Sequence, residues 1–169
     1  IIGVSDKVLE EAVFRNKIEN KYVTIYNYID KENIINKSTI TSTYDKEYDL
    51  FFLGRLTEQK NPQAFIEIVR KMKQMNSNIS SVMIGDGDLR KACEKLIEKY
   101  KLQQNIKLLG FCENPYSIIK NGKIGIMPSK WEGFGLAIIE AMILKKPVLS
   151  SGTGGLSEIF KNNNEFICN

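Results

Sequence analysis

Residues 49–75 read DLFFLGRLTEQKNPQAFIEIVRKMKQM, an apolar run that gives way to a loop and then to a helical pattern. The run DLFFL has the length and composition of a buried strand, and Gly54 ends it. Asn61 and Pro62 combine a helix-capping residue with proline at the first helical position, so a helix is expected from there to about Met75. The stretch therefore predicts a strand, a polar loop and a helix.

The same alternation of strand and helix continues toward the C-terminus. Apolar runs predict further strands at residues 81–84, 106–109, 123–127 and 147–150, and helical patterns follow at about 88–101, 115–120, 134–145 and 155–160. Strands that alternate with helices form βαβ units, whose right-handed crossovers build a parallel sheet with helices on both faces. The expected fold class is α/β, with a doubly wound, Rossmann-like parallel sheet.

The two ends of the chain depart from this pattern. A helical stretch near 6–17, a short strand near 22–26 and a polar connection over 29–43 precede the alternation, and a strand-like piece at 165–168 closes it. We expect residues 1–45 to be the tail of another domain with a hinge. We expect residues 46–169 to be one sheet domain that is truncated at its C-terminus.

Composition excludes several classes of protein. The 169 residues include 24 Lys and Arg against 20 Asp and Glu, and the net charge of +4 is far below the cationic density of nucleic-acid binders. No apolar stretch is long enough to span a bilayer, and no signal-peptide pattern is seen. A cytoplasmic location is therefore expected, with peripheral association at the inner face of the membrane left open, and nucleic acid is not an expected partner.

Cysteine and histidine usage limits the chemistry. Three widely spaced cysteines form neither a disulfide framework nor a CxxC pair, and they are interpreted as reduced thiols that fill small gaps. The chain has no histidine, which removes the commonest general base and the commonest metal ligand. No metal site is expected, so any chemistry must use carboxylates, cations and backbone groups.

Loops that follow strands carry the candidate site, because open α/β sheets bind ligands beyond the carboxyl ends of their strands. Arg55 and Lys60 lie on the loop after the first strand, where two cations can meet a phosphate-bearing ligand; alternatively they are solvated surface charges. Gly85 and Gly87 match the first two glycines of the dinucleotide-binding motif GxGxxG, but Arg90 occupies the position of its third glycine. A tight turn that caps the next helix is the favoured interpretation there.

The stretch EGFGLAIIE, residues 132–140, carries the strongest signal. Gly133 and Gly135 allow close backbone approach and leave unpaired amides at a helix start, which suits a diphosphate. Glu140 points back toward that helix start and could accept hydrogen bonds from a vicinal diol such as ribose, while Glu132 could meet a sugar. The alternatives are that Glu132 complements the helix dipole and that Glu140 is solvated, although an unpaired carboxylate in so apolar a helix is costly.

Together these loops resemble the nucleotide-binding half of family 4 glycosyltransferases, retaining enzymes of the GT-B fold, over nearly the whole chain. The resemblance implies that Arg55 and Lys60 bind the donor diphosphate and that Glu132 lies near the donor sugar, so these three are expected to act in catalysis. Phe111 falls in the loop that contacts the base. The residues expected to bind the donor are Gly54, Gly85, Gly87, Phe111, Gly133, Phe134, Gly135, Leu136 and Glu140.

The resemblance also implies a metal-independent transferase of the hexosyltransferase type, with a UDP- or GDP-linked nucleotide sugar as substrate and no cofactor. Residues 4–6 and 25–30 look like the end of the acceptor domain and the hinge, where the family usually has glycine in place of Tyr28. The acceptor, a saccharide or a lipid-linked glycan, would be held by an N-terminal domain that this chain lacks, so the segment alone is expected to be inactive. Bacterial surface polysaccharide synthesis is the expected setting. A nucleotide-sugar 2-epimerase of the same architecture and a non-catalytic nucleotide-binding module stay open as alternatives.

Overall fold

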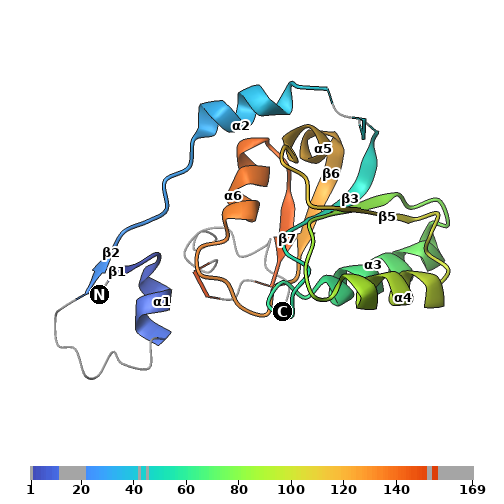
Figure 1. Cartoon of the computed structure of the whole chain (residues 1–169), viewed down its shortest axis with the longest axis horizontal. Coiled ribbons are helices and arrows are strands. Elements are labelled where there is room, and N and C mark those ends of the chain that lie inside the picture. Colours follow the sequence, from blue (N-terminus) through green and yellow to red (C-terminus); the bar gives the residue numbers. More distant parts are fainter. Residues whose placement is uncertain (1, 12–21, 42, 45, 152–153, 156–169) are drawn as a thin grey trace.

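The computed structural model describes residues 2–11, 22–41, 43–44, 46–151 and 154–155, and its centre is a parallel sheet flanked by helices (Figure 1). Five strands of these residues pair in the order β5-β4-β3-β6-β7, and every pairing is parallel. They are β3 (Tyr48–Leu53), β4 (Ser81–Ile84), β5 (Ile106–Gly110), β6 (Gly122–Met127) and β7 (Val148–Ser150). All five predicted strands are confirmed, with ends that differ by at most one residue.

Helices cover both faces of this sheet. α3 (Pro62–Met75) and α4 (Arg90–Lys99) lie on one face, whereas α5 (Tyr116–Asn121) and α6 (Leu136–Ile143) lie on the other (Figure 1). From β3 the chain winds through β4 to β5 in one direction, and from β6 it winds to β7 in the opposite direction. The doubly wound α/β fold is therefore confirmed, and its winding reverses between β3 and β6.

Each face of the sheet has its own apolar core. Phe52 of β3 packs against Phe65 of α3, with ring centroids 5.7 Å apart. Phe51, its neighbour in the chain, points to the opposite face and packs in the cluster that contains Ile118 and Ile138. A parallel strand that is covered by helices on both sides buries both sets of side chains, which explains why the run DLFFL is apolar almost throughout.

Of the two helix-start signals in the sequence, the structure of α3 shows the proline but not the side-chain cap. Pro62 occupies the first turn and the helix ends at Met75, as predicted. Asn61, however, has a φ of 51°, and its side chain makes no capping hydrogen bond. Asparagine tolerates this left-handed conformation better than most residues, so it serves here in the turn between the Lys60 loop and α3 rather than as a side-chain cap.

The polar connection expected over residues 29–43 contains a helix, α2 (Lys31–Ser38), which was not predicted. Asp30 caps it, since its Oδ1 accepts a hydrogen bond from the Asn33 amide at 2.9 Å. Ile34 is buried, and α2 packs against α5 and α6. The polar composition of α2 gives no helical period, and tertiary packing stabilises it instead.

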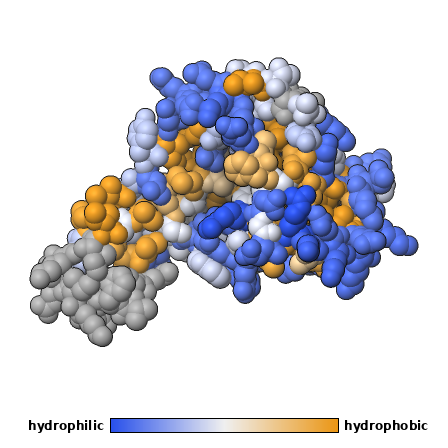
Figure 2. All heavy atoms as spheres, in the orientation of Figure 1, coloured by the Kyte–Doolittle hydropathy of each residue, from blue (hydrophilic) through white to orange (hydrophobic). Residues whose placement is uncertain are grey.

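A smaller unit precedes α2. β1 (Ile2–Gly3) pairs in parallel with β2 (Val23–Thr24), and α1 (Asp6–Glu11) follows β1. Exposed apolar side chains gather on this unit, at the left of Figure 2; among them are Ile2, Val23 and Ile25. The division of the chain at residue 45 stays a prediction.

Some predicted elements lie outside the described residues. They are the first helix beyond Glu11, the last helix beyond Gly155 and the strand at 165–168. Within the described ranges, no helix is long and apolar enough to cross a membrane.

Candidate functional site

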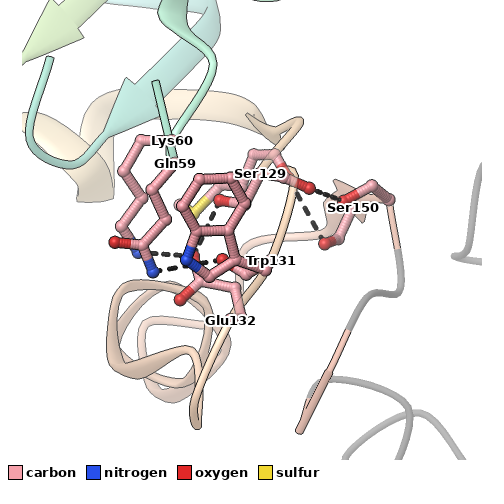
Figure 3. Close-up of polar contacts among 8 residues, drawn as sticks. Gln59, Lys60, Ser129, Trp131, Glu132 and Ser150 are labelled. Carbon is pink, nitrogen blue, oxygen red and sulfur yellow. Dashed lines mark hydrogen bonds and ion pairs between the residues drawn. The ribbon is translucent and has the colours of Figure 1, made fainter. Parts of the chain in front are cut away.

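Two loops meet where the winding of the sheet reverses. Residues 54–61 follow β3 and residues 128–135 follow β6, and these two strands are paired neighbours. The Lys130 amide donates to the Gln59 carbonyl at 2.8 Å. Gln59 Nε2 donates to the Trp131 carbonyl at 3.1 Å (Figure 3). The loops therefore leave the same edge of the sheet and are joined by hydrogen bonds.

A pocket of about 460 Å³ lies between these loops and the first turn of α6. Nine of the residues that were predicted to form the site line it: Gly54, Arg55, Lys60, Glu132, Gly133, Phe134, Gly135, Leu136 and Glu140. The rest of the lining is Val4, Asn27, Leu53, Gln59 and Ala137. A separate groove of about 400 Å³ beside α3 is lined mainly by apolar side chains and by no charged group, so it does not suit a phosphate.

Lys60 and Glu132 form an ion pair across the two loops (Figure 3). The Glu132 side chain is 7% exposed and the Lys60 side chain is 17% exposed. The Ser129 hydroxyl donates to the same carboxylate oxygen, Oε1, at 2.7 Å, and the Ser151 hydroxyl donates to the Ser129 carbonyl. Glu132 is therefore not a solvated acid, because a cation and a hydroxyl hold it in a fixed orientation at the pocket wall.

Arg55 differs from Lys60 in being exposed. Its side chain lines the pocket and forms no hydrogen bond or ion pair with the described residues. One side of the pocket thus carries an unpaired guanidinium beside a paired ammonium. Guanidinium groups bind phosphate oxygens in a bidentate manner, so this pair of cations suits a diphosphate.

The N-terminus of α6 forms the opposite side of the pocket. The helix begins at Leu136 rather than at 134, and Gly135 caps it with a φ of 81°, a conformation that favours glycine. Leu136 and Ala137 line the pocket, and their amides, the first two of the helix, have no acceptor within it, whereas the amides of Ile138 and Ile139 donate to the Gly135 carbonyl. Among the described residues, a side chain at Gly133 would meet only Val4, at 3.5 Å, so their packing does not require this glycine.

Glu140 lies one turn into α6, and its side chain is partly buried. The Tyr116 hydroxyl, from α5, donates to Glu140 Oε1 at 3.3 Å. Burial raises the pKa of the Glu140 carboxyl above its ordinary value, and the hydrogen bond from Tyr116 opposes part of that rise. Tyr116 was not predicted as a site residue, because a tyrosine in a short helix gives no signal until α5 packs against α6.

Replacement of Glu140 by glutamine should stabilise the unliganded chain at neutral pH. A carboxyl whose pKa is raised by folding favours the folded state at low pH, and this contribution is lost as the pH rises through the folded pKa. The Glu140→Gln variant avoids that loss, so its Tm should exceed that of the wild type by a few degrees at pH 7 and converge with it below about pH 4. Thermal melts across this range test it, with the exposed helical Glu98→Gln as the matched control. A lower Tm for Glu140→Gln at pH 7 would contradict the prediction.

Three predicted site residues lie away from the pocket lining. A Cβ at Gly85 would lie 2.0 Å from the Gly54 carbonyl oxygen, and a Cβ at Gly87 would lie 2.6 Å from the Leu56 carbonyl oxygen. These glycines therefore pack directly against the backbone of the loop that carries Arg55. Their turn does not cap α4 with a side chain, since Leu89 is the capping residue. Phe111 is 81% exposed, and its contact with a base stays a prediction.

The two cysteines among the described residues are free thiols. Burial raises the pKa of the Cys93 thiol to about 11, and Cys112 Sγ donates to the Asn114 carbonyl at 3.3 Å. Neither thiol lines the pocket. Among the described residues, no cluster of three or more cysteine and carboxylate side chains is placed to hold a metal ion.

The N-terminal unit also contacts the site. The buried Ser5 hydroxyl donates to the Gly133 carbonyl at 3.0 Å. The rings of Tyr26 and Phe134 have centroids 5.8 Å apart, and Val4 and Asn27 line the pocket. Residues from before α2 therefore form part of the wall around the 132–140 stretch.

Comparisons with known proteins agree on one family. The family model described as glycosyl transferases group 1 matches residues 30–169. An uncharacterized glycosyltransferase of Methanocaldococcus jannaschii is 31% identical over 149 residues, which are 86% of this chain and 37% of that protein. Poly(ribitol-phosphate) alpha-N-acetylglucosaminyltransferase of Staphylococcus aureus is 27% identical over 138 residues, which are 78% of this chain and 28% of that protein.

A solved structure shares the fold. The crystal structure of Anabaena HepE in complex with UDP and glucose matches with a TM-score of 0.77 and 21% identity, covering 94% of this chain and 45% of that one. The chain thus spans less than half the length of each of these proteins.

Proposed function

The chain belongs to the glycosyl transferases group 1 family, and from this we propose that it is the donor-binding half of a retaining glycosyltransferase. The proposed substrate is a nucleotide-diphosphate sugar, UDP- or GDP-linked, with no further cofactor. The observation that carries the proposal is that two cations, a helix N-terminus and two carboxylates all line the same pocket.

Each part of the pocket has a proposed role toward the donor. Arg55, Lys60 and the first amides of α6 would bind the diphosphate. Glu140 would accept hydrogen bonds from the ribose hydroxyls, and Glu132 would orient the sugar. All of these groups line one pocket, so we propose that the donor runs along the N-terminus of α6, with its ribose at Glu140 and its sugar at Glu132.

The proposed chemistry relies on charge stabilisation. When the bond between the sugar C1 and the diphosphate oxygen breaks, its electron pair goes to the leaving diphosphate and C1 gains oxocarbenium character. Preorganised cations and amides stabilise that developing negative charge, and such groups are often the largest contribution to catalysis. The acceptor hydroxyl would then attack C1 from the same face, which retains the configuration, and its proton would pass to the oxygen of the leaving diphosphate.

Properties of the complete protein are proposals as well. We propose that its acceptor is a saccharide or a lipid-linked glycan held by a further domain, that it works in bacterial surface polysaccharide synthesis, and that this segment alone is inactive. The Staphylococcus aureus relative is named for poly(ribitol-phosphate), which supports a polymeric acceptor. A cytoplasmic location with peripheral membrane association is part of the same proposal.

Nucleotide binding to this chain tests the donor site. UDP, GDP, ADP and their glucose or mannose conjugates are each added at increasing concentration, and the Tm is measured. A ligand at 100 times its Kd should add about 2.7 kcal/mol of stability, so the cognate nucleotide should raise the Tm by several degrees. Inorganic sulfate at the same ionic strength is the control for general anion effects. If no nucleotide raised the Tm more than sulfate did, the donor-site proposal would fail.

A further inference from the structure

Tyr116 and Glu140 are 24 positions apart in the chain, and they meet where α5 packs against α6. The tyrosine hydroxyl donates to one carboxylate oxygen, Oε1, at 3.3 Å. Among the described residues, Oε2 receives no hydrogen bond, and Glu140 lines the donor pocket. The hydroxyl thus fixes one edge of the carboxylate and leaves the other edge for a ligand.

We propose that Tyr116 is a positioning residue for the ribose contact of the donor, acting through the Glu140 carboxylate. The inference rests on the proposed function, because it assigns the residue behind Glu140 in that same pocket. Without its tyrosine, the carboxylate could rotate about its last side-chain bond, and a vicinal diol would have to restrict this rotation on binding. With the tyrosine in place, that ordering is present before the donor arrives.

The electrostatics of the pair support this role. Burial raises the pKa of the Glu140 carboxyl, and Tyr116 is the one described group that lowers it. The elements that pack against α6 carry the charged residues Lys31, Glu32 and Lys37 on α2, Lys120 on α5 and Lys123 on β6, and the pocket lining adds Arg55, Lys60 and Glu132. Loss of the tyrosine hydroxyl should therefore let Glu140 take up a proton at a higher pH than in the wild type.

The test compares the Kd of UDP, or of GDP if the wild type prefers it, for the wild-type chain and Tyr116→Phe between pH 5.5 and 8. At pH 8 the variant should bind about threefold to tenfold more weakly, the usual result of losing one hydrogen bond. The ratio of the two Kd values should grow as the pH falls, because Glu140 is neutralised first in the variant. In a Glu140→Gln background, the Tyr116→Phe change should have no further effect.

Tyr100→Phe is the matched control. Tyr100 is also hydrogen-bonded to a glutamate, Glu67, but that pair lies on the α3 and α4 face, outside the pocket. This variant should bind the nucleotide as the wild type does at every pH. If the wild type bound neither nucleotide, the proposed function would fail. The positioning role alone would be overturned by either of two results in a wild type that binds nucleotide. The Kd of Tyr116→Phe could equal that of the wild type. Alternatively, the variant could bind more weakly by a factor that does not change with pH and that persists in the Glu140→Gln background.

Discussion

Replacement of Lys60 by alanine in the complete enzyme is expected to lower turnover about 100-fold to 1000-fold, the usual cost of removing one preorganised group that stabilises developing charge. The ammonium lies at the pocket wall, where the leaving diphosphate is proposed to bind. The measurement is the initial rate of nucleotide release at saturating donor and acceptor. An unchanged rate in a folded variant would exclude Lys60 from the reaction.

Two comparisons separate chemistry from stability in this experiment. Lys130→Ala removes another lysine that pairs with a glutamate across the same two loops, but this pair, with Glu58, is exposed and outside the pocket lining. Its rate should stay within about twofold of the wild type, as expected for a surface ion pair. Lys60→Ala also leaves Glu132 buried without its cation, which costs stability. Adding Glu132→Gln should restore the Tm without restoring turnover.

Replacement of Gly85 by alanine is expected to lower the free energy of unfolding by about 3 kcal/mol, from backbone strain together with overpacking. Gly85 has a φ of +136°, and its new Cβ would lie 2.0 Å from the Gly54 carbonyl oxygen. The neighbouring backbone must move, which displaces Arg55 from the pocket. Chemical denaturation measures the loss of stability, and nucleotide binding should be lost in the same variant.

Gly133→Ala is the control for this change, because the only described neighbour of its Cβ would be Val4, at 3.5 Å. Its free energy of unfolding should stay within about 0.5 kcal/mol of the wild-type value. If Gly85→Ala proved as stable as Gly133→Ala, the close contact between the Gly85 turn and the Arg55 loop would not exist in solution.

Local sequence signals predicted the sheet and most of its helices. Each buried parallel strand is a short apolar run, and in each covering helix apolar residues recur at helical spacing. They also placed Arg55, Lys60 and Glu140 in one site, since loops that follow neighbouring parallel strands must leave the same edge of the sheet. For Arg55 and Lys60 this inference needs only topology. For Glu140, which lies in the helix, it also uses the lean of helical side chains toward the helix N-terminus.

Features that depend on tertiary contacts were not predictable in the same way. α2 is polar and forms against α5 and α6, so its sequence resembles a loop. The partners of Glu132 and Glu140, which are Lys60, Ser129 and Tyr116, come from elsewhere in the chain or from a neighbouring turn. Gly85 packs against the backbone of the Arg55 loop, and its expected role in ligand binding stays a prediction. Glycine tolerates both environments, and sequence alone does not distinguish them.

The contact between the N-terminal unit and the 132–140 stretch limits how this domain can be exchanged between enzymes. Ser5 and Tyr26 reach Gly133 and Phe134, although they precede the sheet domain in the chain. A chimera joined at residue 30, where the family match begins, would replace these neighbours with those of the host protein. Grafts intended to change donor preference should therefore transfer residues 2–28 together with the sheet, so that the transplanted pocket keeps its own wall.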